Sequence, residues 1–229
     1  DLENAGYKFE KTKTGYYVSM NPLLKKLFIE GRITYQSLTS TYAALALDVK
    51  DGQNVLDVCS APGGKAIFVA EKNPTANVVA CDIHPHRVEL IGAYARRMHV
   101  KNVTPTLFDG TAFNKEWAGY FDRVLCDVPC SAMGVVKKQP DVLLNRNEND
   151  IAALKKVQYS ILDNAKNYVK RGGLLVYSTC TIFKEENDDN VEEFLKNNND
   201  FEKYPSEFDG QYLPCDTHDG FFIRRLRRK

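Results

Sequence analysis

Short apolar runs alternate with longer amphipathic segments along most of the chain. Five runs rich in β-branched residues and flanked by turn residues predict buried strands at 54–60, 77–83, 102–108, 121–128 and 173–180. Apolar residues at three- and four-residue spacing predict helices at 65–72, 87–98, 149–170 and 186–196, the third of which stops at Gly172 and Gly173. Strands that alternate with helices are typical of a parallel α/β sheet.

The two ends of the chain differ from this pattern. The tail DGFFIRRLRR (219–228) predicts a last strand that pairs antiparallel at the edge of the sheet. Residues 1–50, with a Leu- and Ala-rich helix predicted at 37–47, are expected to form a small annex on the main domain, 51–229. The first residue is not Met, which favours a fragment or a processed form of a longer protein.

Composition excludes several classes of protein. With 43% hydrophobic residues the chain is not disordered, and its net charge of +1 gives no overall attraction to polyanions. It has neither a long apolar run nor a secretion signal, so we expect a cytoplasmic protein without membrane contact. The six cysteines are then expected as reduced thiols, and neither they nor the four histidines have the spacing of a metal site.

The segment VLDVCSAPGGKA (55–66) ends a predicted strand, turns through Pro and two Gly, and opens a helix near Lys65. Glycines at such a turn let a ligand approach the backbone and the amides that begin the helix. A P-loop is excluded because Cys59 replaces its first Gly and Ala66 follows Lys65, and the spacing also excludes the dinucleotide fingerprint. Two alternatives remain: a site for a nucleoside-type ligand without a pyrophosphate, or a tight turn without a ligand.

Two carboxylates follow the next predicted strands. Asp82 lies about 20 residues after the glycines, where a carboxylate accepts both hydroxyls of a ribose. Asp109 ends the third strand and would accept from an adenine amino group. The alternatives are a helix N-cap for Asp82 and an ordinary turn role for Asp109. Because the carboxyl ends of parallel strands form one ligand-binding edge, the three features support one another.

Cysteines occur at the ends of the last two predicted parallel strands. Asp127 and Cys130 flank Pro129 in DVPCSAMG (127–134), and Cys180 ends YSTC (177–180), which EEN (185–187) follows. We expect Cys130 and Cys180 to face one crevice. Cysteine is most often a small buried hydrophobe, and that is the expectation for the other four: Cys59, Cys81, Cys126 and Cys215.

This set of motifs resembles the signature of RNA cytosine-C5 methyltransferases of the RsmB type. The resemblance rests on SAPGGK, Asp82, DVPCS, STC and EEN, is strengthened by the DGFF of the tail, and extends from about residue 30 to the end. Two departures are Ser60, where Ala is common, and Phe108, which precedes Asp109 where Gly is frequent. The N-terminal helical RNA-binding domain of the family is absent from this sequence, which favours the catalytic portion of a longer protein.

The resemblance implies a Rossmann-like class I fold that depends on S-adenosylmethionine. Such an α/β fold has a mostly parallel seven-stranded sheet with helices on both faces and an antiparallel edge strand. The cofactor-binding residues that the resemblance implies follow the first four predicted strands: Cys59, Ser60, Ala61, Pro62, Gly63, Gly64, Lys65, Asp82, Arg87, Asp109 and Asp127. A metal is not expected.

Four residues are expected to carry out the chemistry: Cys180, Cys130, Asp127 and Lys65. Carbon 5 of cytosine is a poor nucleophile, and a thiolate that adds to carbon 6 activates it. The Pro-Cys motif of the DNA enzymes would assign this role to Cys130, whereas the RNA enzymes assign it to Cys180, with Cys130 assisting product release. We adopt Cys180. Asp127 would hydrogen-bond the cytosine, and Lys65 would orient the base or increase the thiolate fraction.

The expected partner is RNA, and overall likeness favours 16S rRNA bound by a monomeric enzyme. Transfer RNA as the substrate, a non-catalytic RNA-binding module and, more remotely, a nicotinamide oxidoreductase are the alternatives. Candidate phosphate and stacking contacts in the annex are Lys8, Lys11, Lys13, Lys25, Lys26, Arg32, Tyr16 and Tyr17. A second basic cluster comprises Arg224, Arg225, Arg227, Arg228 and Lys229. For each cluster the alternative is a solvated basic face.

Overall fold

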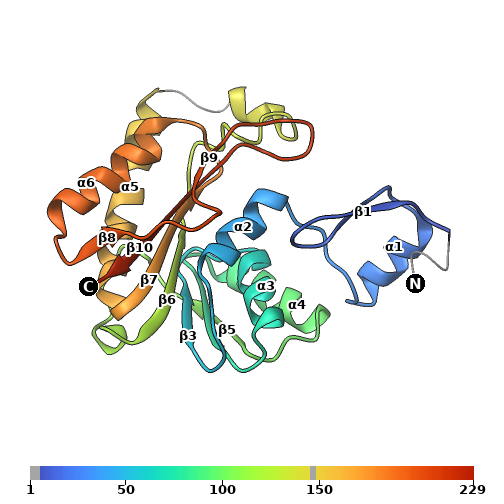
Figure 1. Cartoon of the computed structure of the whole chain (residues 1–229), viewed down its shortest axis with the longest axis horizontal. Coiled ribbons are helices and arrows are strands. Elements are labelled where there is room, and N and C mark those ends of the chain that lie inside the picture. The colour runs from blue at the N-terminus through green and yellow to red at the C-terminus, as the bar shows by residue number, and fades with distance from the viewer. Residues whose placement is uncertain (1–5, 145–147) are drawn as a thin grey trace.

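A computed structural model describes residues 6–144 and 148–229 of the chain (Figure 1). The main body is an α/β domain in which a central sheet lies between two layers of helices, and a smaller group of N-terminal elements lies beside it. In the described ranges no helix has both the length and the apolar character that crossing a membrane requires.

Five parallel strands form the first part of the sheet, in the order β5-β4-β3-β6-β7. They are β3 (Asn54–Asp57), β4 (Asn77–Asp82), β5 (Val103–Leu107), β6 (Phe121–Asp127) and β7 (Val169–Thr179). From β3 the chain builds the sheet outward in one direction, and with β6 it resumes on the other side of β3. The carboxyl ends of β3 and β6 therefore flank a topological switch point, where such sheets bind ligands.

The C-terminal strand lies inside the sheet. β10 (Phe221–Arg228) pairs antiparallel with β7 on one side, and with β8 (Phe201–Lys203) and β9 (Gly210–Tyr212) on the other. The antiparallel pairing is as predicted, but the edge position is wrong, and the sheet has eight strands where seven were expected. The short strands β8 and β9 were missed because three residues carry too little periodic pattern to predict a strand.

Helices cover both faces of the sheet, as Figure 1 shows. One layer contains α2 (Leu38–Ala46), α3 (Gly64–Lys72) and α4 (Pro85–Arg97), and the other contains α5 (Glu148–Ala165) and α6 (Asp188–Asn197). Each layer buries its own apolar cluster against the sheet, the first including Ile67 and Ile91 and the second Leu162 and Phe194. The predicted α/β class with helices on both faces is confirmed.

The helix predicted at 149–170 ends earlier than expected. α5 stops at Ala165, and a 3-10 turn (Lys166–Tyr168) leads directly into β7. Val169 fits the apolar spacing of the helix, but it pairs with Phe121 in the sheet. Gly172 (φ +75°) lies within β7, where the pairing with β6 is irregular, so it is part of a strand rather than a helix stop.

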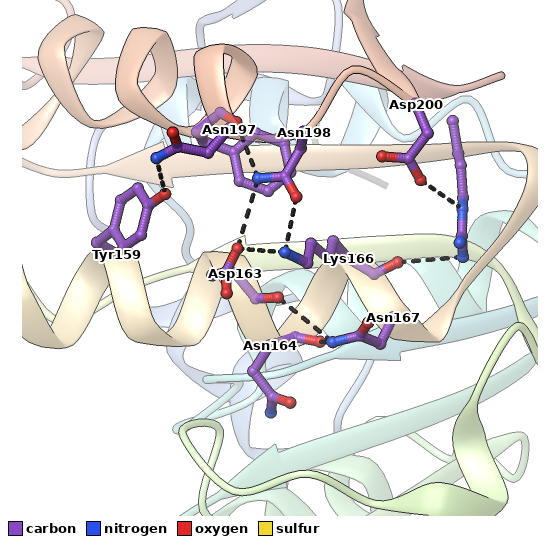
Figure 2. Close-up of polar contacts among 10 residues, drawn as sticks. Tyr159, Asp163, Asn164, Lys166, Asn167, Asn197, Asn198 and Asp200 are labelled. Atoms are coloured by element: carbon purple, nitrogen blue, oxygen red, sulfur yellow. Dashed lines mark hydrogen bonds and ion pairs between the residues drawn. The ribbon is translucent and has the colours of Figure 1, made fainter.

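Polar side chains fix the end of α5 to two neighbouring segments, of which the one around Asn198 is shown in Figure 2. Lys166 Nζ lies 2.6 Å from Oδ1 of Asn198, which follows α6. Asn164, on the last turn of α5, donates from Nδ2 to the carbonyl oxygens of Gly110 (2.8 Å) and Ala112 (2.6 Å). The loop that follows β5 is therefore held by α5, which is relevant because this loop forms part of the site below.

Residues 6–50, within the predicted annex, divide into two parts. β1 (Phe9–Lys11) and β2 (Tyr16–Val18) form an antiparallel pair that, with α1 (Pro22–Ile29), lies beside the main domain in Figure 1. α2 packs into the main core instead, where Ala43 and Ala46 are fully buried. Between the two parts, Gln36 donates from Nε2 to the carbonyl oxygen of Gly64 (2.8 Å), at the start of α3.

Candidate active site

A cavity of about 520 Å³ lies at the carboxyl ends of the parallel strands, a volume typical of small-molecule sites. The predicted residues that line it come from every parallel strand: Cys59, Ala61, Asp82, Arg87, Asp109, Asp127, Cys130 and Cys180. The remaining predicted residues are outside the lining and form the turn before α3 and its first residues: Ser60, Pro62, Gly63, Gly64 and Lys65. The structure thus brings the separate motifs of the sequence to one place.

The turn between β3 and α3 requires glycine and leaves one polar group without a partner. Gly63 has a φ of +106°, and a Cβ at this position would lie 3.3 Å from Cγ2 of Ile91. The amide of Ser60 donates to the carbonyl oxygen of Cys81 (2.6 Å), which ties the turn to β4. The buried Ser60 hydroxyl has no hydrogen-bond partner within the described part of the chain. Ser60 follows Cys59, which lines the cavity, but it lies outside the cavity lining, and its side chain acts to lower the pKa of the neighbouring Asp57 carboxyl.

Two carboxylates at the ends of β4 and β5 line the cavity and also stabilise their own turns. Asp82 is buried, with Oδ2 3.1 Å from Nη1 of Arg87 and Oδ1 accepting from the amide of His84 (3.0 Å). Asp109 accepts from the amide (2.9 Å) and the hydroxyl (2.7 Å) of Thr111. The turn role considered for Asp109 is therefore present, whereas the helix N-cap considered for Asp82 is wrong, because His84 is the N-cap of α4; both carboxylates also line the cavity.

Asp127, at the end of β6, joins a cation and a hydroxyl. Its Oδ2 lies 2.5 Å from Nζ of Lys65, and its Oδ1 accepts a hydrogen bond from the Ser178 hydroxyl (2.7 Å). Burial alone would lower the pKa of Lys65, but the charge and hydrogen bond of Asp127 outweigh it and raise that pKa. Lys65 is thus held as a cation at the base of the site.

The two cysteines meet at the cavity. The Sγ atoms of Cys130 and Cys180 are 3.3 Å apart, with Cys130 buried and Cys180 half-buried. The hydrogen bond from Cys130 lowers the pKa of Cys180, and the charge of Lys65 acts in the same direction, against burial and Asp127. The same hydrogen bond, together with burial, raises the pKa of Cys130. These directions favour Cys180 as the sulfur that carries the negative charge and Cys130 as the thiol that donates to it.

Several apolar residues of the site were missed in the sequence. Ile83 follows β4 and Phe108 follows β5, and Val157 and Ile161 line the cavity from α5. Val157 and Ile161 belong to an apolar helical stripe that predicts core packing, and periodicity alone does not distinguish a core from a ligand wall. The exposure of Val157 (42%) is the structural signal that separates it from the core.

Asp57 is a second omission. It ends β3 with only 2% of its surface exposed, and neither carboxylate oxygen has a hydrogen-bond partner among the described residues. Burial raises the pKa of this carboxyl from 3.8 to about 7, although the charge of Lys65 acts in the opposite direction. Asp57 lies in an otherwise apolar strand, directly before the SAPGGK motif. A charged residue at such a buried strand position is the signal that could have identified it from the sequence.

All six cysteines are free thiols, but two of the four expected to be buried are not. Cys81 and Cys126 are buried within the sheet, as predicted. Cys59 is half-buried because it lines the cavity, and Cys215 is exposed because it lies in the loop between β9 and β10. Within the described ranges no group of three or more His, Cys, Asp or Glu side chains is arranged to hold a metal.

The C-terminal basic cluster is engaged within the protein. Arg224 lies 2.8 Å from Asp188, Arg227 pairs with Glu202, and Arg228 pairs with Asp200 (3.2 Å). Arg225 donates to backbone carbonyls of residues 46, 204 and 205, and Lys229 donates to the carbonyl oxygen of residue 199. These contacts favour a structural role for this cluster over the RNA contact that was considered.

The basic residues of the annex are exposed, and one of them, Arg32, lies near aromatic side chains. A second cavity of about 500 Å³ is lined by Tyr16, Tyr17, Arg32 and Tyr35 together with residues of α2 and α3. Tyr16 and Tyr35 expose about half of their surface (56% and 46%). Lys13 is engaged by Glu207 in an ion pair, so this lysine serves at least in part to hold the hairpin to the C-terminal region.

Comparison with known proteins agrees with this geometry. The profile of a family described as 16S rRNA methyltransferase RsmB/F matches residues 44–227. The chain belongs to this family. Among RsmB/F relatives, it is 38% identical over 209 residues to ribosomal RNA small subunit methyltransferase B of Salmonella paratyphi B, covering 88% of the chain and 48% of that protein. It is also 38% identical over 223 residues to the probable methyltransferase B of Bacillus subtilis, covering 88% of the chain and 49% of that protein.

A solved structure shares the whole architecture. NSun6 from Pyrococcus horikoshii, determined with SFG, superposes with a TM-score of 0.80 at 28% identity, over 93% of this chain and 56% of that one. The present chain spans about half the length of the curated relatives it matches. The predicted family, the Rossmann-like fold and the dependence on S-adenosylmethionine are confirmed by these relatives.

The residues that line the cavity at the carboxyl ends of the parallel strands fit S-adenosylmethionine. Asp82 and Asp109 could supply acceptors for the hydroxyl and amino groups of an adenosine, and Ile83 and Phe108 could supply apolar surface for its ring. This cavity could therefore hold the cofactor.

Proposed function

We propose that this chain is the catalytic part of an RNA cytosine-C5 methyltransferase that acts on 16S rRNA. The proposed reaction passes through a covalent bond between Cys180 and carbon 6 of the cytosine. The observation that carries the proposal is the 3.3 Å separation of the Cys130 and Cys180 sulfurs at the cofactor cavity. The names of the curated relatives support the class of RNA.

The chemistry begins with the thiolate of Cys180. Its sulfur forms a bond to carbon 6 of cytosine, which places the electron pair of the 5,6 double bond on carbon 5. S-adenosylmethionine, when bound, supplies the methyl group that this carbon takes up. Asp127 would accept a hydrogen bond from the amino group of the base, and Lys65 would offset by its positive charge the negative charge that develops on the ring.

Release of the product breaks the bond between the Cys180 sulfur and carbon 6. Carbon 5 loses its proton to a base, the C5–H electron pair restores the 5,6 double bond, and the carbon–sulfur bond breaks with its electrons returning to Cys180. The thiol of Cys130 donates a hydrogen bond to this sulfur and stabilises it as it leaves. The lowered pKa of Cys180 and the raised pKa of Cys130 support this division of roles.

RNA would reach the site from the side of the annex. The target base must leave its stack, at a cost of a few kcal/mol in a duplex and less in a loop. Tyr16, Tyr17 and Tyr35 offer faces on which neighbouring bases stack, and Arg32 lies among them.

Two substitutions test the proposal directly. Cys180→Ala should abolish methyl transfer and any covalent RNA–protein species, whereas Cys130→Ala should accumulate that species, visible as a slower band on a denaturing gel. An adduct that forms in the Cys180 variant but not in the Cys130 variant would reverse the assignment. Mapping of 5-methylcytosine in ribosomal and transfer RNA from a deletion strain identifies the substrate, and loss from transfer RNA alone would refute the 16S assignment.

A further inference from the structure

Glu186 is a buried carboxylate behind the two cysteines. It lies in the 3-10 turn Lys184–Glu186 and has no exposed surface (0%). The hydrogen bonds that its carboxylate makes are all accepted from donors on other segments. Its oxygens accept from the amide (2.9 Å) and hydroxyl (2.5 Å) of Ser131 and from Nε2 of Gln158 (2.8 Å). A carboxylate at this depth is costly unless donors surround it, so its presence demands a reason.

The bonds of Glu186 connect the two residues that follow the two cysteines. The Ser131 hydroxyl has one proton, which it donates to Glu186, so its oxygen is left to accept from the hydroxyl of Thr181 (2.8 Å). Ser131 follows Cys130 and Thr181 follows Cys180. The carboxylate therefore fixes the direction of the hydrogen bond that joins the two cysteine segments.

Gln158 extends the hydrogen-bond network of Glu186 to the residue that precedes Cys130. Gln158, which donates to Glu186, also donates from Nε2 to the carbonyl oxygen of Pro129 (3.0 Å). Residues on both sides of Cys130 are thus held by one network centred on Glu186. Cys180 has a further tie, because its carbonyl oxygen accepts from the amide of Gly134 (2.9 Å).

We propose that Glu186 is a positioning residue that holds the Cys130 segment against Cys180 and so sets the sulfur–sulfur contact used in product release. The proposal has two parts. The catalytic half, the role of the sulfur contact in product release, rests on the proposed function. The geometric half, the approach of the two sulfurs, is independent of any substrate. Glutamine at position 186 has nearly the same shape, but its NH2 group would either face the donors Ser131 N–H and Gln158 Nε2 or reverse the direction of the hydrogen bond with the Ser131 hydroxyl.

Oxidation by diamide measures the sulfur contact without RNA or cofactor. Diamide accepts two electrons and two protons from two thiols, and the two sulfurs join in a disulfide. Peptide mapping by mass spectrometry identifies the Cys130–Cys180 product and its rate of formation. We expect Glu186→Gln to slow this rate roughly tenfold, the ratio that corresponds to one hydrogen bond to a charged group. An unchanged rate would overturn the proposal.

Two controls separate positioning from a general loss of structure. Glu185→Gln makes the same chemical change on the neighbouring, exposed residue and should leave the rate unchanged. Tyr177→Phe removes a buried hydrogen bond to the backbone carbonyl of Glu186 (2.6 Å) without touching the carboxylate. It should lower the melting temperature but leave the disulfide rate unchanged. If Tyr177→Phe slows the disulfide as much as Glu186→Gln, general loosening explains the effect and the proposal fails.

A smaller change tests the proposal if Glu186→Gln does not fold. Ser131→Ala removes only the hydroxyl that links Glu186 to Thr181, and we expect the disulfide to form about threefold more slowly, as for one neutral hydrogen bond. A rate equal to that of the unsubstituted chain would refute the link.

The catalytic half has its own measurement. With RNA and S-adenosylmethionine, Glu186→Gln should accumulate the covalent RNA adduct and lower kcat roughly tenfold, while KM for the cofactor stays within about twofold. Equal losses in cofactor binding and turnover would instead indicate a role in the cofactor cavity and overturn the proposal. If the unsubstituted chain and its full-length form never form an adduct, the proposed function fails, and the disulfide rates still decide the geometric half.

Discussion

The buried carboxyl of Asp57 should make the stability of this protein depend on pH. Its pKa rises from 3.8 in an exposed chain to about 7 in the fold, because burial penalises the charged form. Between these two values the unfolded chain has lost the proton that the folded chain retains. Stability therefore falls as the pH rises from about 4 to about 7, and the loss is complete above the folded pKa.

Asp57→Asn removes this titration and keeps the shape of the side chain. The substitution removes the free-energy cost of ionising a buried carboxyl. This cost grows by about 2 to 3 kcal/mol between about pH 5 and about pH 8, at 1.36 kcal/mol per pKa unit. Any cost of burying the amide is the same at every pH, so the change with pH isolates the charge. The variant should thus gain stability relative to the unsubstituted protein as the pH is raised.

Urea unfolding followed by circular dichroism at several pH values measures this gain. With an m value of about 2 to 3 kcal/mol/M, the difference between the two unfolding midpoints should change by about 1 M across the range. Glu89→Gln, which removes a charge from an exposed position on α4, is the control and should show no such trend. Midpoint differences that stay constant with pH, or that change in the opposite direction, would refute the reasoning.

Three further predictions follow from individual contacts. Gly134→Ala should destabilise the fold by about 2 kcal/mol or more in thermal or urea unfolding, because its Cβ would lie 2.2 Å from the carbonyl oxygen of residue 220; Gly15→Ala, in open space, should have little effect. Asp82→Asn should weaken S-adenosylmethionine binding about tenfold by calorimetry, and unchanged affinity would exclude the ribose contact. Lys65→Met should raise the pKa of Cys180, so iodoacetamide should alkylate this thiol more slowly at neutral pH; an equal or faster rate would contradict the role given to Lys65.

The sequence predicts the parallel part of the fold because that part is encoded locally. β-branched runs and amphipathic segments specify β3 to β7 and their helices, and the alternation of strands with helices indicates that the strands are parallel. The interior position of β10 is not encoded locally, because it depends on pairing with two short strands that have little hydrophobic pattern of their own. Val169 shows the same limit: its spacing is helical, and only its pairing with Phe121 makes it a strand residue.

The candidate site divides in a similar way. Residues within motifs, such as Asp82 and Cys180, were located because each motif ends a strand and all parallel strands end at one edge. The ion pairs of Arg224 and Arg227 with Asp188 and Glu202 were not foreseen, since partners distant in sequence leave no mark on a basic run. Glu186 was noted as part of a motif, yet its link to Ser131 emerges only from the folded chain.

The interior position of β10 also bears on synthesis and quality control. A nascent chain that has emerged only as far as β8 has made β7 but not the strand that separates the two. The exposed amides and carbonyls of β7 then form an open edge, which other unfinished chains can extend into aggregates. A stop codon before residue 221 would therefore yield material for chaperones and proteases rather than a shortened enzyme.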